Sequence, residues 1–195
     1  MELLQKNRPY EQSSDERLAE LLKRGDKTAF VTLYERHKRY VYLFCLKMLH
    51  EPDGAKDVTQ STFLKVLERH HQLTDPGKFR SWLLTIARND CITAMRNSKV
   101  TVALEDSEDE VSKMSATDTN FVPDEEIRQR VVAQAIAALR PDFREVVVLR
   151  EYQGLSYREI AEVINAAEST VKFRLFWARK QLYRNLKPLL ARLGT

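Results

Sequence analysis

Two short helices separated by a tight turn are predicted near the C-terminal end of the chain, and they restrict its fold more than any other feature. Ser156 and Glu159 have the spacing of a capping box, in which the Ser hydroxyl accepts from the third helical N–H and the Glu carboxylate accepts from the Ser amide. Asn165 tolerates the left-handed backbone conformation that ends a helix. A second helix is predicted from about Ser169, so the segment has the pattern of a helix-turn-helix.

The second predicted helix has an apolar stripe and a basic surface. Four apolar residues recur at intervals of four, three and four positions, and therefore share one face of the helix. The cations lie on its other faces, which suits the major groove of duplex DNA. A basic helix face is by itself more often simply solvated, but the capped helix before it favours DNA binding. The stripe consists of Val171, Leu175, Ala178 and Leu182, and the residues pointing away from it include Ser169, Phe173, Phe176 and Lys180.

The rest of the chain also has helical periodicity. Only five Gly and six Pro leave little room for a turn-rich β-sandwich. The first apolar face opens at Asp26, a suitable N-cap, and breaks are expected at 50–54 and 74–77. The fold class is therefore predicted to be all-α. The predicted helices cover residues 26–48, 58–67, 79–95 and about 124–139, and a further helix starts at Pro141.

Charge is segregated along the chain. Residues 1–97 carry 17 Lys and Arg against 13 Asp and Glu, residues 98–127 carry 2 against 9, and residues 128–195 carry 13 against 6. The acidic middle is rich in Ser, Thr and Asp without a sustained helical period, which predicts a flexible linker between two small helical domains. The two basic domains suggest a polyanionic partner. The acidic linker would repel or mimic that partner, or it would serve only to keep the chain soluble.

No metal, cofactor or membrane-spanning segment is predicted. Cys45 and Cys91 lie within apolar helical patterns without CxxC or paired-His spacing, so burial as small hydrophobic side chains is favoured over metal ligation. His70 and His71 have no partner at ligand spacing. The longest apolar run, residues 146–149, is far shorter than the roughly 20 residues of a membrane span, and the first 17 residues lack a signal-peptide core. We therefore expect a cytoplasmic protein without direct membrane insertion.

Motifs at both ends of the chain make it resemble the extracytoplasmic-function (ECF) sigma factors, the small two-domain members of the bacterial primary sigma family. Each motif alone is weak, but their order and separation around an acidic linker are specific. The resemblance implies a removable, non-enzymatic subunit that directs core RNA polymerase to a subset of promoters and helps to melt the −10 region. The motifs are DVTQSTFLKV at 57–66, FRSWLLTIARN at 79–89, LRPDFREV at 139–146, LSYREIAE at 155–162 and STVKFRL at 169–175.

The resemblance also assigns roles to individual residues. It implies that residues 1–97 bind core polymerase and the −10 element, where a loop captures a flipped base and basic residues hold the opened strand. Residues 128–195 would read the −35 element in the major groove. The implied polymerase-binding residues are Asp57, Gln60, Ser61 and Phe63. The implied −10 DNA-binding residues are Leu73, Thr74, Asp75, Lys78, Arg80, Arg88, Asn89, Thr93 and Arg96. The implied −35 DNA-binding residues are Ser169, Thr170, Lys172, Phe173, Arg174, Arg179 and Lys180.

The recognition helix departs from the family pattern. Phe173 stands where a small or polar residue is common, and Trp177 stands where Arg is frequent. Phe173 is suited to contact a thymine methyl group, whereas Trp177 would pack within the domain or against an inhibitor protein. The resemblance further implies that an anti-sigma factor regulates the protein, and a membrane-bound anti-sigma factor would hold the protein at the membrane. It also implies that residues 98–127 thread a polymerase channel. Promoter sequence and inducing signal do not follow from these residues.

Two rival functions are considered. A free-standing helix-turn-helix regulator would leave the DVTQSTF and FRSWL segments unexplained, and it would bind a specific duplex without polymerase. A nucleic-acid-processing enzyme needs clustered carboxylates, an activated nucleophile or a Gly-rich phosphate loop, and the sequence contains none of these patterns.

Overall fold

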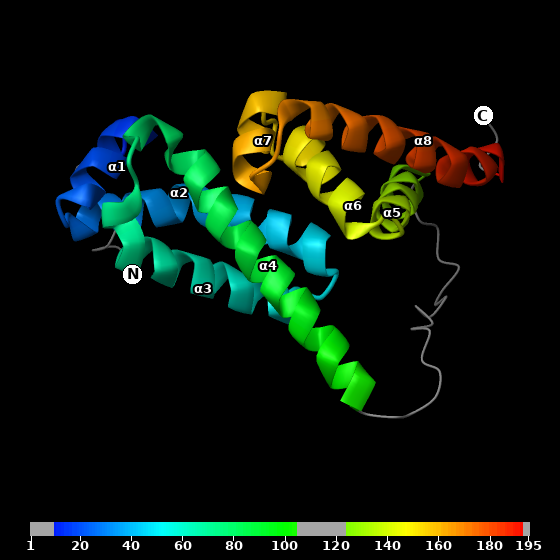
Figure 1. Ribbon diagram of the computed structural model, residues 1–195, viewed down its shortest axis with the longest axis horizontal. Coiled ribbons are helices and arrows are strands. Elements are labelled where there is room, and N and C mark those ends of the chain that lie inside the picture. Colours follow the sequence, from blue (N-terminus) through cyan, green and yellow to red (C-terminus); the bar gives the residue numbers. More distant parts are fainter. Residues whose placement is uncertain (1–9, 105–123, 193–195) are drawn as a thin grey trace.

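The computed structural model describes residues 10–104 and 124–192, and every regular element within these ranges is a helix (Figure 1). The all-α prediction is therefore confirmed. The N-terminal helices are α1 (Asp15–Lys23), α2 (Lys27–Leu49), α3 (Pro52–Arg69), the 3-10 turns η2 (His70–Gln72) and η3 (Pro76–Lys78), and α4 (Phe79–Leu104). The C-terminal helices are α5 (Asp124–Ala137), α6 (Pro141–Val147), the π-helical turn η4 (Val148–Tyr152), α7 (Tyr157–Ile164) and α8 (Glu168–Arg192).

Local capping groups define several helix ends. The Asp26 carboxylate accepts from the amides of Thr28 and Ala29 at 2.8 and 3.1 Å, which starts α2 as predicted. His50 ends α2 in the left-handed region at φ 61°, and Pro52 starts α3 two residues later. Gly154, at φ +67°, breaks the helical backbone before α7 in a conformation where a side chain would be strained.

Three helix boundaries differ from the sequence prediction. Helix α1 was not expected, although Ser14 caps it by accepting from the Arg17 amide at 3.2 Å. Helix α3 begins at Pro52 rather than near residue 58, because its first turn contributes only Ala55 to the core. Helix α4 continues to Leu104, nine residues beyond the helix end expected at 95 and into the linker expected from residue 98. Most of the predicted linker, residues 105–123, lies outside the described residues.

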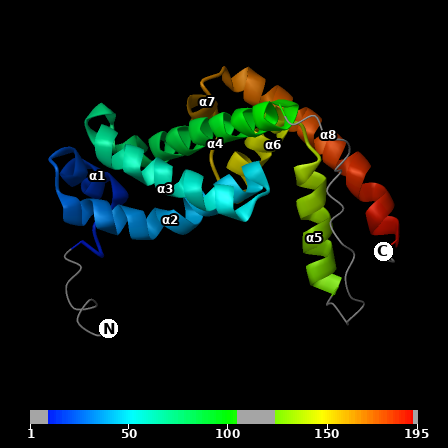
Figure 2. The ribbon, with the colours of Figure 1, turned by 90° about the horizontal axis from the view of Figure 1, so that it is seen from below.

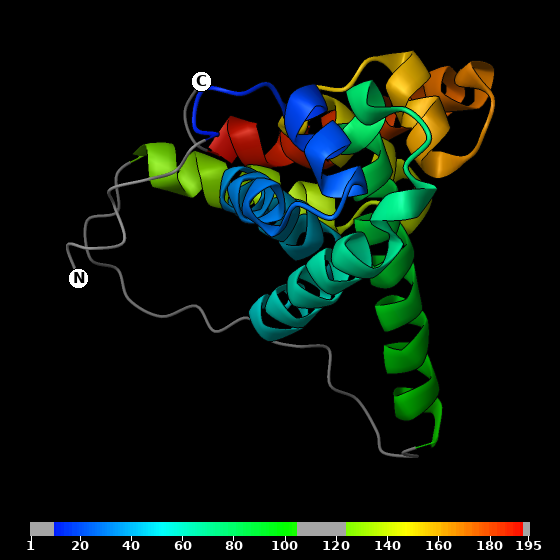
Figure 3. The same cartoon turned by 90° about the vertical axis from the view of Figure 1, so that its left-hand side faces the viewer.

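The two groups of helices have apolar centres and pack against each other. Helices α2, α3 and α4 enclose the N-terminal centre, which includes the fully buried Phe44 and Leu83, while α6, α7 and α8 enclose Leu149 and Leu175. Helix α4 lies between α3 on one side and α7 on the other (Figures 1 and 2). Its C-terminal half projects away from the other helices (Figure 3). Among the described residues, no helix is long and apolar enough to span a membrane.

Candidate polymerase-binding and nucleic-acid-binding surfaces

Helices α7 and α8 form the predicted helix-turn-helix. The Glu159 amide donates to the Ser156 hydroxyl at 3.2 Å, and the Ser156 amide donates to the Glu159 carboxylate at 2.7 Å, which is the complete capping box. These bonds to Ser156 lower the pKa of Glu159. Asn165 turns the chain at φ 50°. The capped helix and the turn therefore fix where α8 begins.

Burial along α8 follows the predicted stripe. Val171, Leu175 and Ala178 are fully buried or nearly so, and Leu182 is half-buried against the same core. Three aromatic side chains remain on the outer surface, with Phe173 59%, Phe176 61% and Trp177 37% exposed. The ring of Trp177 packs edge-on against Phe173 and Phe176, with centroids 6.2 and 5.6 Å apart, and the Lys180 ammonium lies 4.9 Å from its centroid. We call Phe173, Phe176 and Trp177 the aromatic patch.

The predicted −35 residues are not equally available to DNA. Five of the seven are exposed and Thr170 is half-buried; the exposed ones are Ser169, Lys172, Phe173, Arg179 and Lys180. Lys172 pairs with Glu168 at 3.1 Å and Arg179 with Glu151 at 3.1 Å, both in exposed surroundings where water and salt weaken the pairs. Arg174 differs, because its guanidinium lies 3.7 Å from the buried carboxylate of Glu145 on α6. Arg174 therefore faces the domain rather than solvent.

The loop before α4 holds the first predicted −10 residues. Asp75 accepts from the Gly77 amide at 2.9 Å, and the Thr74 carbonyl lies 3.5 Å from the Lys23 ammonium. Thr74, Asp75 and Lys78 are exposed. Leu73 is only 2% exposed and packs in the core, so its side chain anchors the loop and is not available to a base.

The predicted −10 residues of α4 fall into two groups: those bonded to other parts of the protein and those exposed to solvent. Arg80 donates to the Tyr40 hydroxyl and to the Gln153 carbonyl, and Arg88 pairs with Glu145. Both acceptors, Gln153 and Glu145, belong to the C-terminal domain. Asn89, Thr93 and Arg96 are exposed further along the helix, with Thr93 bonded to the Asn89 carbonyl. Trp82 is half-buried against the core.

The outer face of α3 carries part of the predicted polymerase-binding set. Asp57 and Gln60 are exposed, and Ser61 is half-buried and donates to Asp90 at 3.3 Å. Phe63 is 3% exposed and packs edge-on against the Tyr34 ring at 4.9 Å. Phe63 therefore stabilises the helix and does not itself offer a contact surface.

Two exposed leucines extend this face and were absent from the predicted set. Leu64 is 61% and Leu67 is 41% exposed, although leucine is usually buried. Asp57, Gln60, Leu64 and Leu67 are spaced by three, four and three residues and so share one helix face. The apolar pattern of the sequence groups Leu67 with the buried side of this helix, and that placement is wrong, because Leu67 lies on the outer face with Asp57, Gln60 and Leu64.

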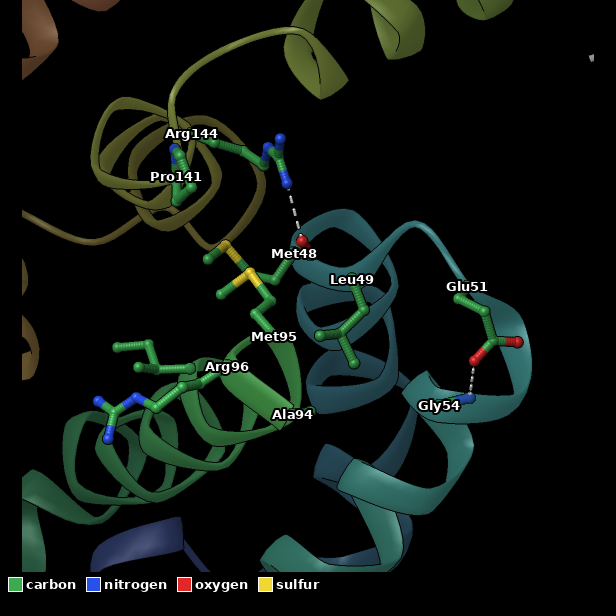
Figure 4. Close-up of a pocket in the computed structure, with 10 residues that line it drawn as sticks. Met48, Leu49, Glu51, Gly54, Ala94, Met95, Arg96, Pro141 and Arg144 are labelled. Carbon is green, nitrogen blue, oxygen red and sulfur yellow. Dashed lines mark hydrogen bonds between the residues drawn. The ribbon is translucent and has the colours of Figure 1, made fainter. Parts of the chain in front are cut away.

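A cavity of about 750 Å³ lies where α2 and α4 meet α6. Figure 4 shows Met48 and Met95 at its wall, with Pro141 and Arg144 from α6 above them. The Arg144 guanidinium donates to the Met48 carbonyl at 2.9 Å and so joins the two domains across it. Among the described residues, no cluster of His, Cys, Asp and Glu has the arrangement of a metal site. Cys45 and Cys91 are buried, as predicted.

Family models match both groups of helices. The sigma-70 region 2 model matches residues 33–101, and a sigma-70 region 4 model matches residues 129–182. The chain is 31% identical to the RNA polymerase sigma-H factor of Pseudomonas aeruginosa, over 92% of this chain and 97% of that protein. It is also 31% identical to the ECF RNA polymerase sigma-E factor of Haemophilus influenzae, over 92% and 99% of the two chains.

Solved structures support the fold. CnrH, determined in complex with the cytosolic domain of CnrY, matches with a TM-score of 0.68 and 24% identity, covering 89% of this chain and 97% of that one. RpoE of Bartonella quintana, determined with the anti-sigma factor NepR, matches with a TM-score of 0.67 and 24% identity, over 81% and 96% of the chains. Family models, relatives and fold agree with the motifs: the chain belongs to the ECF sigma factors and is a promoter-selecting subunit of bacterial RNA polymerase.

Proposed function

We propose that the two domains divide the work of promoter recognition. The C-terminal domain binds the −35 element through the exposed surface of α8, and the N-terminal domain binds core polymerase through α3 and the −10 element through α4 and the preceding loop. The observation that carries this proposal is the surface of α8, where the exposed Lys172, Arg179 and Lys180 surround the aromatic patch on a helix fixed by a capping box.

The exposed groups of α8 suit both parts of duplex recognition. Lysine and arginine bind phosphates and hold the register, whereas sequence is read by contacts to base edges. Phe173 is the aromatic residue nearest the N-terminal end of α8, where the helix enters a groove, and its ring is suited to a thymine methyl group. Arg174 is directed to Glu145, so we assign it a smaller share of the base contacts than Phe173.

The −10 region requires single-stranded recognition. The loop residues Thr74, Asp75 and Lys78 are exposed next to α4, and Asn89, Thr93 and Arg96 continue along that helix. Capture of an unpaired base offsets the few kcal/mol that unstacking costs, so melting needs no ATP. The protein thus acts by binding and not as an enzyme.

Regulation and location follow from the partners. The solved relatives CnrH and RpoE are complexes with the cytosolic domain of CnrY and with the anti-sigma factor NepR, and we propose that an anti-sigma factor likewise binds this chain. Because its proposed site of action is core polymerase, the protein would work in the cytoplasm. The acidic segment 98–127 would occupy a polymerase channel.

The test is transcription in vitro by core polymerase and this protein on a library randomised in both promoter elements. Phe173→Ala is expected to change or relax the −35 sequences selected, whereas Lys172→Ala is expected to lower transcription about uniformly across them, and both should leave the −10 sequences unchanged. Lys38→Ala is the matched control, because Lys38 is also exposed and paired with a neighbouring glutamate but lies on α2. Identical −35 selection by wild type and Phe173→Ala, together with undiminished transcription by Lys172→Ala, would contradict the proposal.

A further inference from the structure

The aromatic patch of α8 is arranged around one residue, Trp177. The centroid of its indole ring lies 6.2 Å from that of Phe173 and 5.6 Å from that of Phe176, and the ring planes meet at 61° and 85°. Aromatic rings attract each other edge to face at such separations. The Lys180 ammonium lies 4.9 Å from the centroid of the same indole ring. Three neighbouring side chains therefore restrict the orientation of the indole ring.

The indole ring is also the least exposed member of the patch. Trp177 is 37% exposed, whereas Phe173 is 59% and Phe176 is 61% exposed. Contiguous apolar surface that a folded protein leaves in water often marks a contact site. The two phenyl rings present most of their surface to a partner, whereas the other members of the patch cover most of the indole ring. Trp177 is therefore placed to support the outer rings.

The direction of helical side chains places Trp177 against the turn that carries Phe173. Trp177 follows Phe173 by four residues and shares its helix face, and long side chains lean toward the N-terminal end of their helix. The indole ring therefore leans toward the phenyl ring of Phe173. Lys180, three residues further on, leans over the indole ring in the same way. The four-residue spacing thus makes Phe173 the base-reading candidate and Trp177 the residue behind it.

A phenyl ring that reads a thymine methyl group benefits from being held in place. Dispersion attraction declines steeply once two atoms separate beyond contact distance, so a ring that samples several rotamers makes the contact only part of the time. Ordering a mobile side chain during binding also costs free energy, and a side chain that is already ordered avoids this cost. The packing of Trp177 against Phe173 supplies such order before DNA binds.

We propose that Trp177 is a positioning residue for −35 recognition: it holds the Phe173 ring in the orientation that meets a thymine methyl group, and it does not itself contact a base. The inference rests on the proposed role of Phe173 and adds the residue that determines how strongly the methyl group is recognised. Promoter choice at one −35 thymine then depends on two aromatic side chains, of which only one contacts the base.

The first test removes single methyl groups from the promoter. Each thymine of a −35 element selected by the wild type is replaced in turn by deoxyuridine, which lacks the 5-methyl group but keeps the base-pairing edge. Binding by core polymerase carrying this protein is followed by fluorescence anisotropy. For the wild type we expect about fourfold weaker binding at one thymine, the effect of one buried methyl group. Phe173→Ala should show no methyl effect at that thymine, and Trp177→Ala should show at most about a twofold effect.

Two further variants distinguish positioning from a general loss of structure. Trp177→Phe keeps an aromatic ring beside Phe173 and should restore most of the methyl effect. Tyr183→Ala is the matched control, because Tyr183 is a 66% exposed aromatic residue of α8 outside the aromatic patch, and this variant should keep the full effect. A purely structural role of Trp177 would weaken binding to every promoter by the same factor and leave the methyl effect unchanged, which would overturn the inference.

Other results of this test would also overturn the inference. One is a second thymine whose methyl effect disappears in Trp177→Ala but persists in Phe173→Ala, because Trp177 would then contact a base itself. Another is a wild type that shows no methyl effect or selects no −35 thymine. The proposed function fails on a different result, namely −35 selection and transcription that the α8 variants leave unchanged in the promoter library.

A double variant provides the second test, which uses the promoter library and no modified base. If Trp177 acts through Phe173, then Phe173→Ala with Trp177→Ala should relax −35 selection no further than Phe173→Ala alone, within about twofold. Independent contributions would instead multiply, so a double variant whose loss of selectivity equals the product of the two single losses would refute the positioning role.

Discussion

The capping box of α7 allows a quantitative prediction. Ser156→Ala removes the hydroxyl that accepts from the Glu159 amide at 3.2 Å, and it leaves the box with one bond of two. Loss of an N-cap side chain costs about 1 kcal/mol, within a usual range of about 0.5–2 kcal/mol. Because α7 contributes the buried Ile160, Val163 and Ile164, fraying of α7 also weakens the packing of α8 against it.

Thermal and urea unfolding followed by circular dichroism measure this cost. For a cooperative unit the size of the C-terminal domain, about 1 kcal/mol lowers the melting temperature by roughly 4–8 °C. Ser156→Thr is the control, since threonine can supply the same hydroxyl. A loss below about 0.3 kcal/mol for Ser156→Ala, or an equal loss for Ser156→Thr, would refute the assignment of the cap.

The same cap has a pH dependence with a definite sign. The bonds from Ser156 lower the pKa of Glu159 below its ordinary value, so ionised Glu159 stabilises the folded state. That contribution is complete above the unfolded-state pKa and is lost as pH falls through the lower folded-state value. The stability difference between wild type and Glu159→Gln should therefore be constant near neutral pH and shrink under acid conditions.

Three further outcomes are expected. Leu64→Ser should weaken binding to core polymerase in a fluorescence assay by about tenfold with little loss of stability, because its side chain is 61% exposed, and equal affinity would argue against the α3 surface. Leu175→Ala should cost about 2–5 kcal/mol in urea unfolding, because the side chain is 1% exposed, and a cost below about 1 kcal/mol would contradict its place in the core. Asp15, whose pKa is lowered to about 2 chiefly by its hydrogen bond to His37, stabilises the fold above pH 4. Since its side chain is 38% exposed, Asp15→Asn should cost only about 1 kcal/mol at pH 7, and the difference should shrink as pH falls from about 4 and disappear only below the folded-state pKa.

Local signals made the helix-turn-helix predictable. Ser156 and Glu159 form their hydrogen bonds three residues apart in the chain, and Asn165 adopts the left-handed conformation without a distant partner. Every group that defines the ends of α7 is therefore visible in one short stretch of sequence. The start of α2 at Asp26 follows the same logic. Helix α1 had equally local signals in Ser14 and Leu18, and it was missed because its nine residues give only a short periodic pattern.

The availability of the site residues could not be predicted in the same way. Leu73 and Phe63 belong to matching motifs, but whether a motif side chain faces a partner or the core depends on the helices packed against it. The sequence places Arg174 on a face of α8 that would be open to solvent or to DNA. The structure instead directs its side chain toward Glu145, 29 residues earlier in the chain. Such pairings arise only when separate helices meet.

Contacts between the two groups of helices explain why a chain with two basic domains can keep them together. Net positive charge on both domains opposes docking. The opposition is overcome locally, because Lys78 pairs with Glu162, Arg88 pairs with Glu145, and Arg80 donates to the Gln153 carbonyl. No pattern within one helix reveals these pairs, because their partners are 57 to 84 residues apart in the chain.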